Sequence, residues 1–258
     1  MTLRTLVFSA TLLLASTLTT PAQQTIDDKT PANRTQRIVL VGDSTMNHLS
    51  GWGGAFCDDL AGDVECFILA RNGRSSKNFR TEGFWDRALA LKPTYMLIGF
   101  GGNDVPGKGP ERETDPATTF YANMKAYVDD ARAAGATPIL LTPMEVRKYD
   151  RAGKLVHTYD AYAEATRKVA ADTHTPLIDL YALTTKFLET LTQTQADQLN
   201  HVDPTAPKAI DRAHLNRRGQ EIIGGMVAEA LATAEPKLAR SIHIQSTTEA
   251  LKKIDPTK

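Results

Sequence analysis

The sequence predicts a three-layer α/β domain, because short apolar runs alternate with longer amphipathic stretches along most of its length. The runs are rich in aliphatic and β-branched residues, and their continuous apolar character suits strands that are covered on both faces of a parallel sheet. Five such runs occur, at residues 37–41, 64–69, 95–100, 138–141 and 176–180. No internal repeat and no second domain is evident, so residues 37–235 are taken as one domain.

The stretches between these runs predict helices. Asp115 followed by Pro116 is typical of a helix start, because a carboxylate can cap the first turn and proline fits its geometry. Apolar residues then recur at helical spacing as far as Ala131, and Gly135 is placed to end the helix. Two further helices are expected at about 159–173 and at 217–234.

The two ends of the chain are expected to lie outside this domain. Arg4, an apolar run at 6–14 and the small residues around Ala22 have the layout of a signal peptide over residues 1–22, which predicts a secreted or periplasmic protein. The apolar run is too short for a membrane-spanning helix, and no other segment approaches the roughly 20 apolar residues that a span needs. Residues 23–36 are interpreted as a linker and residues 236–258 as a tail without an assigned role.

Net charge and cysteine content exclude few classes of protein. The 30 basic and 30 acidic residues cancel, so there is no electrostatic reason to expect a nucleic-acid partner. The two cysteines, Cys57 and Cys66, can form one disulfide in an oxidising compartment or remain as two buried thiols. Both alternatives stay open, and the spacing fits no metal-ligand pattern.

Ser44 is the candidate nucleophile, because active sites in open parallel sheets gather at the carboxyl ends of the strands. It lies in Gly42-Asp43-Ser44-Thr45, directly after the first predicted strand. A serine that opens a helix there is close to backbone N–H groups that favour developing negative charge. The alternative is that Asp43 or Ser44 only caps the helix.

The loops after the second and third strands offer candidate oxyanion donors. Gly73 lets the backbone N–H approach a ligand without an intervening side chain. Asn103, in Gly101-Gly102-Asn103-Asp104, supplies a neutral amide that can be fixed in place. Ordinary turns are the alternative for both loops, because glycine, asparagine and aspartate dominate turns.

Asp211 and His214, just before the last predicted helix, are the candidate base and its partner. An aspartate three residues before a histidine can reach Nδ1 within one turn, which leaves Nε2 to take the serine proton. A metal site is a competing interpretation, but the pair supplies only two ligands and no third is evident. Together the four segments provide a nucleophile, two oxyanion donors, a base and its orienter, and this chemistry needs no metal or organic cofactor.

These segments resemble, in order, the four sequence blocks of the SGNH (GDSL-like) hydrolases. The matching residues are Gly42-Asp43-Ser44, Gly73, Gly101-Gly102-Asn103-Asp104 and Asp211 with His214. The resemblance implies a flavodoxin-like, five-stranded parallel sheet in the order 2-1-3-4-5. It also implies an oxyanion hole made by Ser44, the main-chain N–H of Gly73 and the side chain of Asn103.

Within that family the sequence is most similar to rhamnogalacturonan acetylesterases. The likeness rests on Thr45 after the serine, on Gly51-Trp52-Gly53, on Arg74-Ser75-Ser76 after Gly73, and on Leu215-Asn216 after the histidine. One departure is Gly102, where that group often has a histidine before the asparagine of the third block. The absence of this side chain affects the expected shape of the substrate pocket and leaves the expected catalytic residues unchanged.

The resulting hypothesis is a secreted ester hydrolase that removes acetyl groups from a plant cell-wall polysaccharide such as rhamnogalacturonan. Its partner would be an acetylated polysaccharide or oligosaccharide. A lipase or thioesterase of the same family would need a deep apolar pocket, and the polar loop at 71–77 argues against one. A non-catalytic carbohydrate-binding module and a phosphate-binding flavodoxin-like protein are alternatives of other classes. The latter would need a phosphate-cradling loop that the first strand lacks.

Overall fold

The computed structural model describes residues 36–207, 209–243 and 254. The expected signal peptide, nearly all of the expected linker and most of the tail lie outside the described residues. The first strand begins at Gln36, which pairs with Val64, so the expected linker extends one residue too far. At the other end, residues Pro236–Ser241 form a 3-10 turn, and Ile242 bridges to Leu60.

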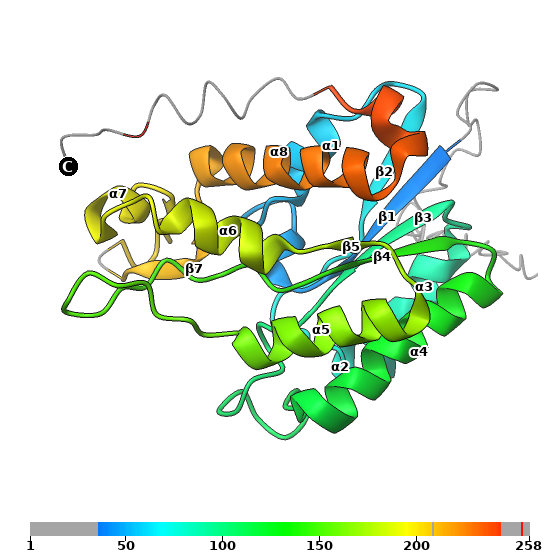
Figure 1. Cartoon of the computed structure of the whole chain (residues 1–258), viewed down its shortest axis with the longest axis horizontal. Helices are drawn as coiled ribbons and strands as arrows, with labels where there is room; N and C mark the ends of the chain where they lie inside the picture. Colours follow the sequence, from blue (N-terminus) through cyan, green and yellow to red (C-terminus); the bar gives the residue numbers. More distant parts are fainter. Residues whose placement is uncertain (1–35, 208, 244–253, 255–258) are drawn as a thin grey trace, which may run out of the picture. The chain divides into compact units, whose positions relative to one another are not determined.

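The expected sheet is confirmed. Five parallel strands lie in the order β2-β1-β3-β4-β5 (Figure 1). Their bounds are β1 (Gln36–Gly42), β2 (Val64–Ile68), β3 (Tyr95–Gly99), β4 (Thr137–Leu141) and β5 (Leu177–Ile178). The fifth strand is shorter than expected, because Asp179 caps the next helix by accepting a hydrogen bond from the N–H of Ala182.

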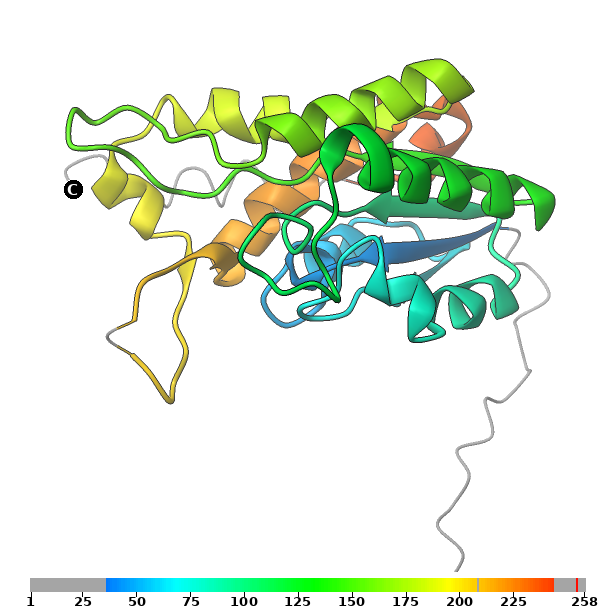
Figure 2. The same cartoon turned by 90° about the horizontal axis from the view of Figure 1, so that it is seen from below.

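Helices cover both faces of the sheet, as Figures 1 and 2 show. The helices are α1 (Gly53–Asp58), α2 (Asn78–Thr81), α3 (Phe84–Ala90), α4 (Tyr121–Ala133), α5 (Asp160–Thr173), α6 (Leu180–Leu188), α7 (Gln193–Asp197) and α8 (Arg217–Ala234). The helix expected after Asp115 starts with a π-helical turn at Pro116–Phe120, and α4 follows it. Asp115 caps that turn as expected, and Gly135 adopts a left-handed φ of 81° just past the end of α4.

The strand pattern produces two cores, one on each face of the sheet. In β1, Ile38 and Leu40 face one core with residues of α1 and α8, whereas Val39 and Val41 face the other with residues of α3, α4 and α5. Successive side chains of a strand point to opposite faces, so a run that is apolar throughout is what a sheet covered on both sides requires. This packing fixes the carboxyl edge of the sheet, where the loops of interest emerge.

A two-stranded antiparallel ribbon was missed by the sequence pattern. It consists of β6 (Asn200–His201) and β7 (Asp211–Leu215), which pair with an irregular register; β7 is labelled in Figure 1. The segment with Asp211 and His214 is therefore part of a strand, whereas a loop before the last helix was expected. Asparagine, aspartate and alanine are poor strand formers, so neither short segment has a strand-like composition.

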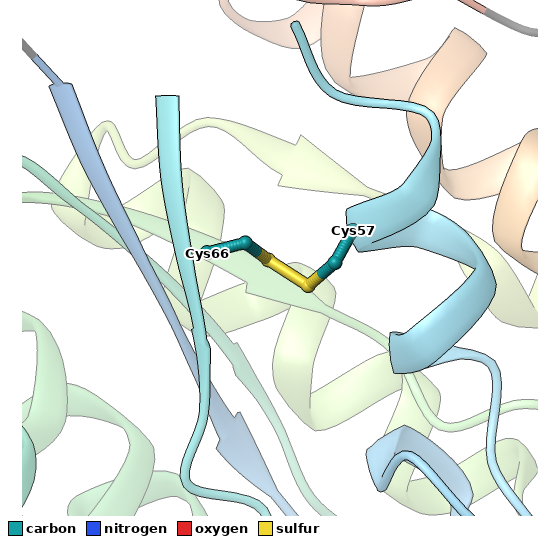
Figure 3. The surroundings of a disulfide bond; sticks show 2 residues. All are labelled: Cys57 and Cys66. Carbon is teal, nitrogen blue, oxygen red and sulfur yellow. A yellow bond between two sulfur atoms is a disulfide. The ribbon is translucent and has the colours of Figure 1, made fainter. Parts of the chain in front are cut away.

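Cys57 and Cys66 form a disulfide, which decides between the two alternatives left open by the sequence. The bond joins α1 to β2, the strand at one edge of the sheet (Figure 3). The part of the chain that the structure describes has no helix long and apolar enough to cross a membrane.

Candidate active site

Ser44 opens a 3-10 turn (Ser44–Met46) directly after β1. Asp43 caps this turn, because its carboxylate accepts the N–H of Thr45 at 2.8 Å and the Thr45 hydroxyl at 2.7 Å. Gly42 is required here, since a Cβ at this position would collide with the carbonyl oxygen of Gly99 and with Met46. Gly42 therefore lets the end of β1 and the serine turn pack closely against β3, and Ser44 lies at the carboxyl edge of the sheet.

The structure brings Ser44, His214 and Asp211 into one chain of hydrogen bonds. The Ser44 Oγ lies 2.7 Å from Nε2 of His214, and Nδ1 of the same ring lies 2.7 Å from Oδ2 of Asp211. Each ring nitrogen therefore faces the partner that the sequence predicted for it. A serine, a histidine and a carboxylate in this order can remove the serine proton and stabilise the imidazolium that forms.

Asp211 is held in place by its own backbone. Its Oδ1 accepts the N–H groups of Ala213 and His214, each at 3.0 Å, which leaves Oδ2 for the imidazole. Burial alone would raise the pKa of Asp211, but the backbone and side-chain hydrogen bonds from His214 outweigh it and hold the pKa below its usual value. The three-residue spacing thus works within a strand, because the carboxylate folds back on the N–H groups two and three residues further along the chain.

Arg147 holds β7 in place through hydrogen bonds, and the sequence pattern did not predict this role. The side chain is 2% exposed. Its guanidinium donates to the His214 carbonyl at 2.5 Å and to Oδ1 of Asn200 at 2.7 Å, while its backbone N–H donates to the Arg212 carbonyl at 3.2 Å. Burial lowers the pKa of Arg147 to about 10, and the negative charge of Asp211 opposes that shift. The group therefore remains a buried cation at neutral pH.

One signal in the sequence could have identified Arg147. The carboxyl end of each parallel strand is where functional residues gather, and Arg147 lies six residues after the end of β4 at Leu141. The loop after the fourth strand carries no motif like those after the first three strands, and a single arginine in a polar loop is usually a surface residue.

The loops with the candidate oxyanion donors meet beside the serine turn. Gly73 adopts a φ of 70°, and within the described residues its N–H has no hydrogen-bond partner. The amide of Asn103 donates one hydrogen bond to the carbonyl of Arg74 at 3.2 Å, so its second N–H stays available. The Arg71 N–H donates to the carbonyl of Gly42 at 2.9 Å, which ties the Gly73 loop to the end of β1.

Asp104 connects these loops, and its role was also missed. Its carboxylate is fully buried and accepts hydrogen bonds from the N–H and hydroxyl of Ser76, from the hydroxyl of Thr114 and from the N–H of Gly101. Burial raises the pKa of Asp104 to about 6, so the group is ionised at neutral pH. The hydrogen bonds from Ser76 and Thr114 oppose the rise in pKa that burial causes, and they join the loops that follow β2 and β3.

Gly102, the departure noted in the sequence, lies against a buried carboxylate. A Cβ at this position would lie 2.8 Å from Oδ2 of Asp43 and 3.8 Å from the Tyr159 hydroxyl. Burial raises the pKa of Asp43, and hydrogen bonds from Thr45 oppose that rise. A histidine at position 102 would need this carboxylate to move, so the local packing accounts for the glycine.

The metal interpretation gains no third ligand from the structure. Among residues 36–207, 209–243 and 254, no group of three or more histidine, cysteine, aspartate or glutamate side chains could hold an ion.

The sequence model of the GDSL-like lipase/acylhydrolase family matches residues 40–222. The chain belongs to this family. The matched range begins in β1 and ends in α8, so it includes all four segments described above. Membership of the family makes the chain an ester hydrolase with the SGNH fold.

Two curated relatives come from Bacillus subtilis (strain 168). The rhamnogalacturonan acetylesterase RhgT is 30% identical over 211 residues, which cover 76% of this chain and 89% of the relative. The probable rhamnogalacturonan acetylesterase YesY is 29% identical over 213 residues, which cover 80% of this chain and 96% of the relative.

Solved structures agree on the fold. The YXIM protein of Bacillus subtilis superposes with a TM-score of 0.65 at 23% identity, and the match covers 77% of this chain and 56% of that one. The chain therefore spans little more than half of that protein. A catalytic mutant of the acetylxylan esterase Axe2 from Geobacillus stearothermophilus superposes with a TM-score of 0.59 at 17% identity, over 78% of this chain and 94% of the other.

Proposed function

We propose that this protein is a secreted serine esterase that removes acetyl groups from rhamnogalacturonan. The observation that carries the chemistry is the hydrogen-bonded chain from Ser44 through His214 to Asp211, with 2.7 Å at each step. The curated relatives support the substrate class, since both are named rhamnogalacturonan acetylesterases.

The geometry gives a two-step reaction. Ser44 Oγ attacks the acetyl carbonyl carbon while Nε2 of His214 takes its proton, and Asp211 stabilises the resulting imidazolium. The Gly73 N–H and the Asn103 amide stabilise the oxyanion of the tetrahedral intermediate. His214 then protonates the departing sugar oxygen as the carbon–oxygen bond breaks, which leaves an acetyl group on Ser44. A water molecule, deprotonated by the same imidazole, releases acetate and restores the serine.

Two features support export. Residues 1–22 have the composition of a signal peptide, and the Cys57–Cys66 disulfide is of a kind that persists in oxidising compartments such as the periplasm or the cell exterior. Mass spectrometry of the protein recovered outside the cytoplasm would test this part of the proposal. A mature N-terminus close to residue 23 is expected, and retention of the full chain in the cytoplasm would contradict it.

Acetate release from acetylated rhamnogalacturonan, acetylated xylan and p-nitrophenyl acetate, measured side by side, tests the activity. The wild type should have its highest kcat/KM among the polysaccharides on rhamnogalacturonan. The Ser44→Ala variant should lose on the order of 10³-fold or more on every substrate, because only the oxyanion and binding contributions remain.

Ser241→Ala is a matched control, because Ser241 is buried beside Ala61 at the amino side of β2, away from the strand ends that carry the site. It should keep wild-type rates. A Ser44→Ala rate within about tenfold of the wild type would contradict the assignment of the nucleophile, since such a loss is too small for a missing nucleophile. A preference for xylan would contradict the substrate.

A further inference from the structure

A groove of about 500 Å³ opens beside the catalytic serine. Asn47, His48 and Leu49, which follow the serine turn, line one part of it, and residues on both sides of Gly73 line another, namely Ile68, Ala70, Arg71, Asn72 and Arg74. Two contacts given above fix its position: the Arg71 N–H bonds the end of β1, and the Arg74 carbonyl holds the Asn103 amide. A polymer that presents an acetyl group to Ser44 would therefore extend into this groove.

Positive charge is concentrated at this groove. Three guanidinium groups lie around the ring of Phe84, with Arg71 at 5.3 Å, Arg74 at 5.6 Å and Arg87 at 5.3 Å from its centroid. Within the described part of the chain, Glu82 is the carboxylate that pairs with this group, and it pairs with Arg74 at 2.7 Å. Like charges held this close repel one another, so the arrangement favours binding of an anion.

Arg71 and Arg87 have no ion pair among the residues described, and Arg71 is the one of the two that lines the groove. Each nitrogen of the Arg74 guanidinium already has one contact, with Glu82 through Nε and Nη2 and with the carbonyl of Asn72 through Nη1. Arg71 is exposed, lines the groove and has no ion-pair partner among the residues described. Its planar fork of N–H donors matches the geometry of a carboxylate.

We propose that this groove binds the carboxylate of a uronic acid residue next to the acetylated sugar, with Arg71 as the principal contact. The inference rests on the proposed function, and it names what distinguishes the substrate: an acidic polysaccharide backbone rather than a neutral one. A neutral backbone such as xylan offers the arginines no anion. The flanking uronic acid residue then determines which polysaccharide is preferred, because the triad can attack any acetyl ester in the same way.

Inhibition of p-nitrophenyl acetate hydrolysis by unacetylated oligosaccharides tests the groove. Oligogalacturonides should inhibit the wild type competitively, and neutral xylo-oligosaccharides of the same length should not. Arg71→Gln should raise the inhibition constant of the oligogalacturonide by about fivefold to tenfold, as expected for loss of one charge-assisted contact at a partly screened position. Raising the salt concentration from about 0.05 M to 0.5 M should weaken inhibition of the wild type more than that of the variant.

Arg240→Gln is the matched control, because it removes the same charge from an exposed arginine in the segment that packs beside Ala61, before β2. It should leave the inhibition constant unchanged. Equal inhibition by acidic and neutral oligomers, or an unchanged constant in Arg71→Gln, would overturn the proposal. If the proposed function were wrong, acetylated rhamnogalacturonan would release no acetate. Inhibition of p-nitrophenyl acetate hydrolysis would still measure binding of the oligosaccharides in the groove.

Discussion

Replacing Arg147 by methionine tests how the catalytic strand is held. Methionine keeps an unbranched apolar stem of similar length but loses the guanidinium. Two buried acceptors, the His214 carbonyl and Oδ1 of Asn200, then lose charged donors at 2.5 and 2.7 Å. Each unsatisfied acceptor costs about 1–3 kcal/mol, and relief from burying the cation offsets part of that sum. A net loss of about 2–3 kcal/mol in the free energy of unfolding is expected.

The expected effect on catalysis is larger than the effect on substrate binding. His214 must keep its 2.7 Å contact with Ser44, and a displacement of about 1 Å at a reacting group can cost on the order of 10²-fold in rate. We expect kcat for p-nitrophenyl acetate to fall by about 10- to 100-fold while KM changes little. Urea unfolding of the same variant gives the loss of stability.

Arg147→Lys separates anchoring from charge. Lysine keeps the positive charge but cannot form the same pair of directed hydrogen bonds, so kcat should lie between those of the wild type and of Arg147→Met. Assays must run well below the transition temperature, where both variants are folded. A folded Arg147→Met enzyme with wild-type kcat would refute the reasoning, since the arginine would then support the fold without positioning the histidine.

Three further changes give distinct outcomes. Asn103→Ala should lower kcat by roughly 10²–10³-fold with little change in KM, because the amide acts on the developing oxyanion; a change confined to KM would make it a substrate-binding residue. Because burial raises the pKa of Asp104 to about 6 from an ordinary 3.8, the folded state binds that proton more tightly than the unfolded state. The free energy of unfolding of the wild type, relative to that of Asp104→Asn, should therefore fall by up to about 3 kcal/mol as pH rises from about 4 to 6. Urea unfolding at both pH values measures this change, and a rise in place of the fall would contradict the prediction. Replacing Cys57 and Cys66 by alanine opens a loop with a sequence separation of 9 and should cost about 2–3 kcal/mol, seen as a lower transition temperature with unchanged kcat below it.

The parts of the fold that could be predicted are those that local pattern determines. Residues 38–41 are apolar at every position, which marks a strand covered on both faces before any partner is known. The last helix was expected from residue 217 to about 234, which agrees with α8, and in the structure the Asn216 side chain caps its start. The order of the strands came from the family resemblance, since periodicity says nothing about which strands are neighbours.

The parts that could not be predicted depend on contacts between distant segments. Arg147 lies 67 positions before His214 in the sequence, and nothing near it indicates that it is buried. The ribbon of β6 and β7 exists because two weak strand formers meet, so neither could be recognised alone. The bridge from Ile242 to Leu60 likewise links the expected tail to the segment between α1 and β2.

The placement of the triad on two separate sheets has a consequence for how the enzyme loses activity. Ser44 follows β1, a strand that is paired on both sides within the five-stranded sheet, whereas Asp211 and His214 belong to the ribbon, where β6 has only two residues. Proteins open locally before they unfold as a whole, and short ribbons belong to the less stable regions. On warming, the base should separate from the nucleophile while the large sheet is still intact. Amide hydrogen exchange should then be faster in β7 than in β3, and inactivation should precede the loss of the fold.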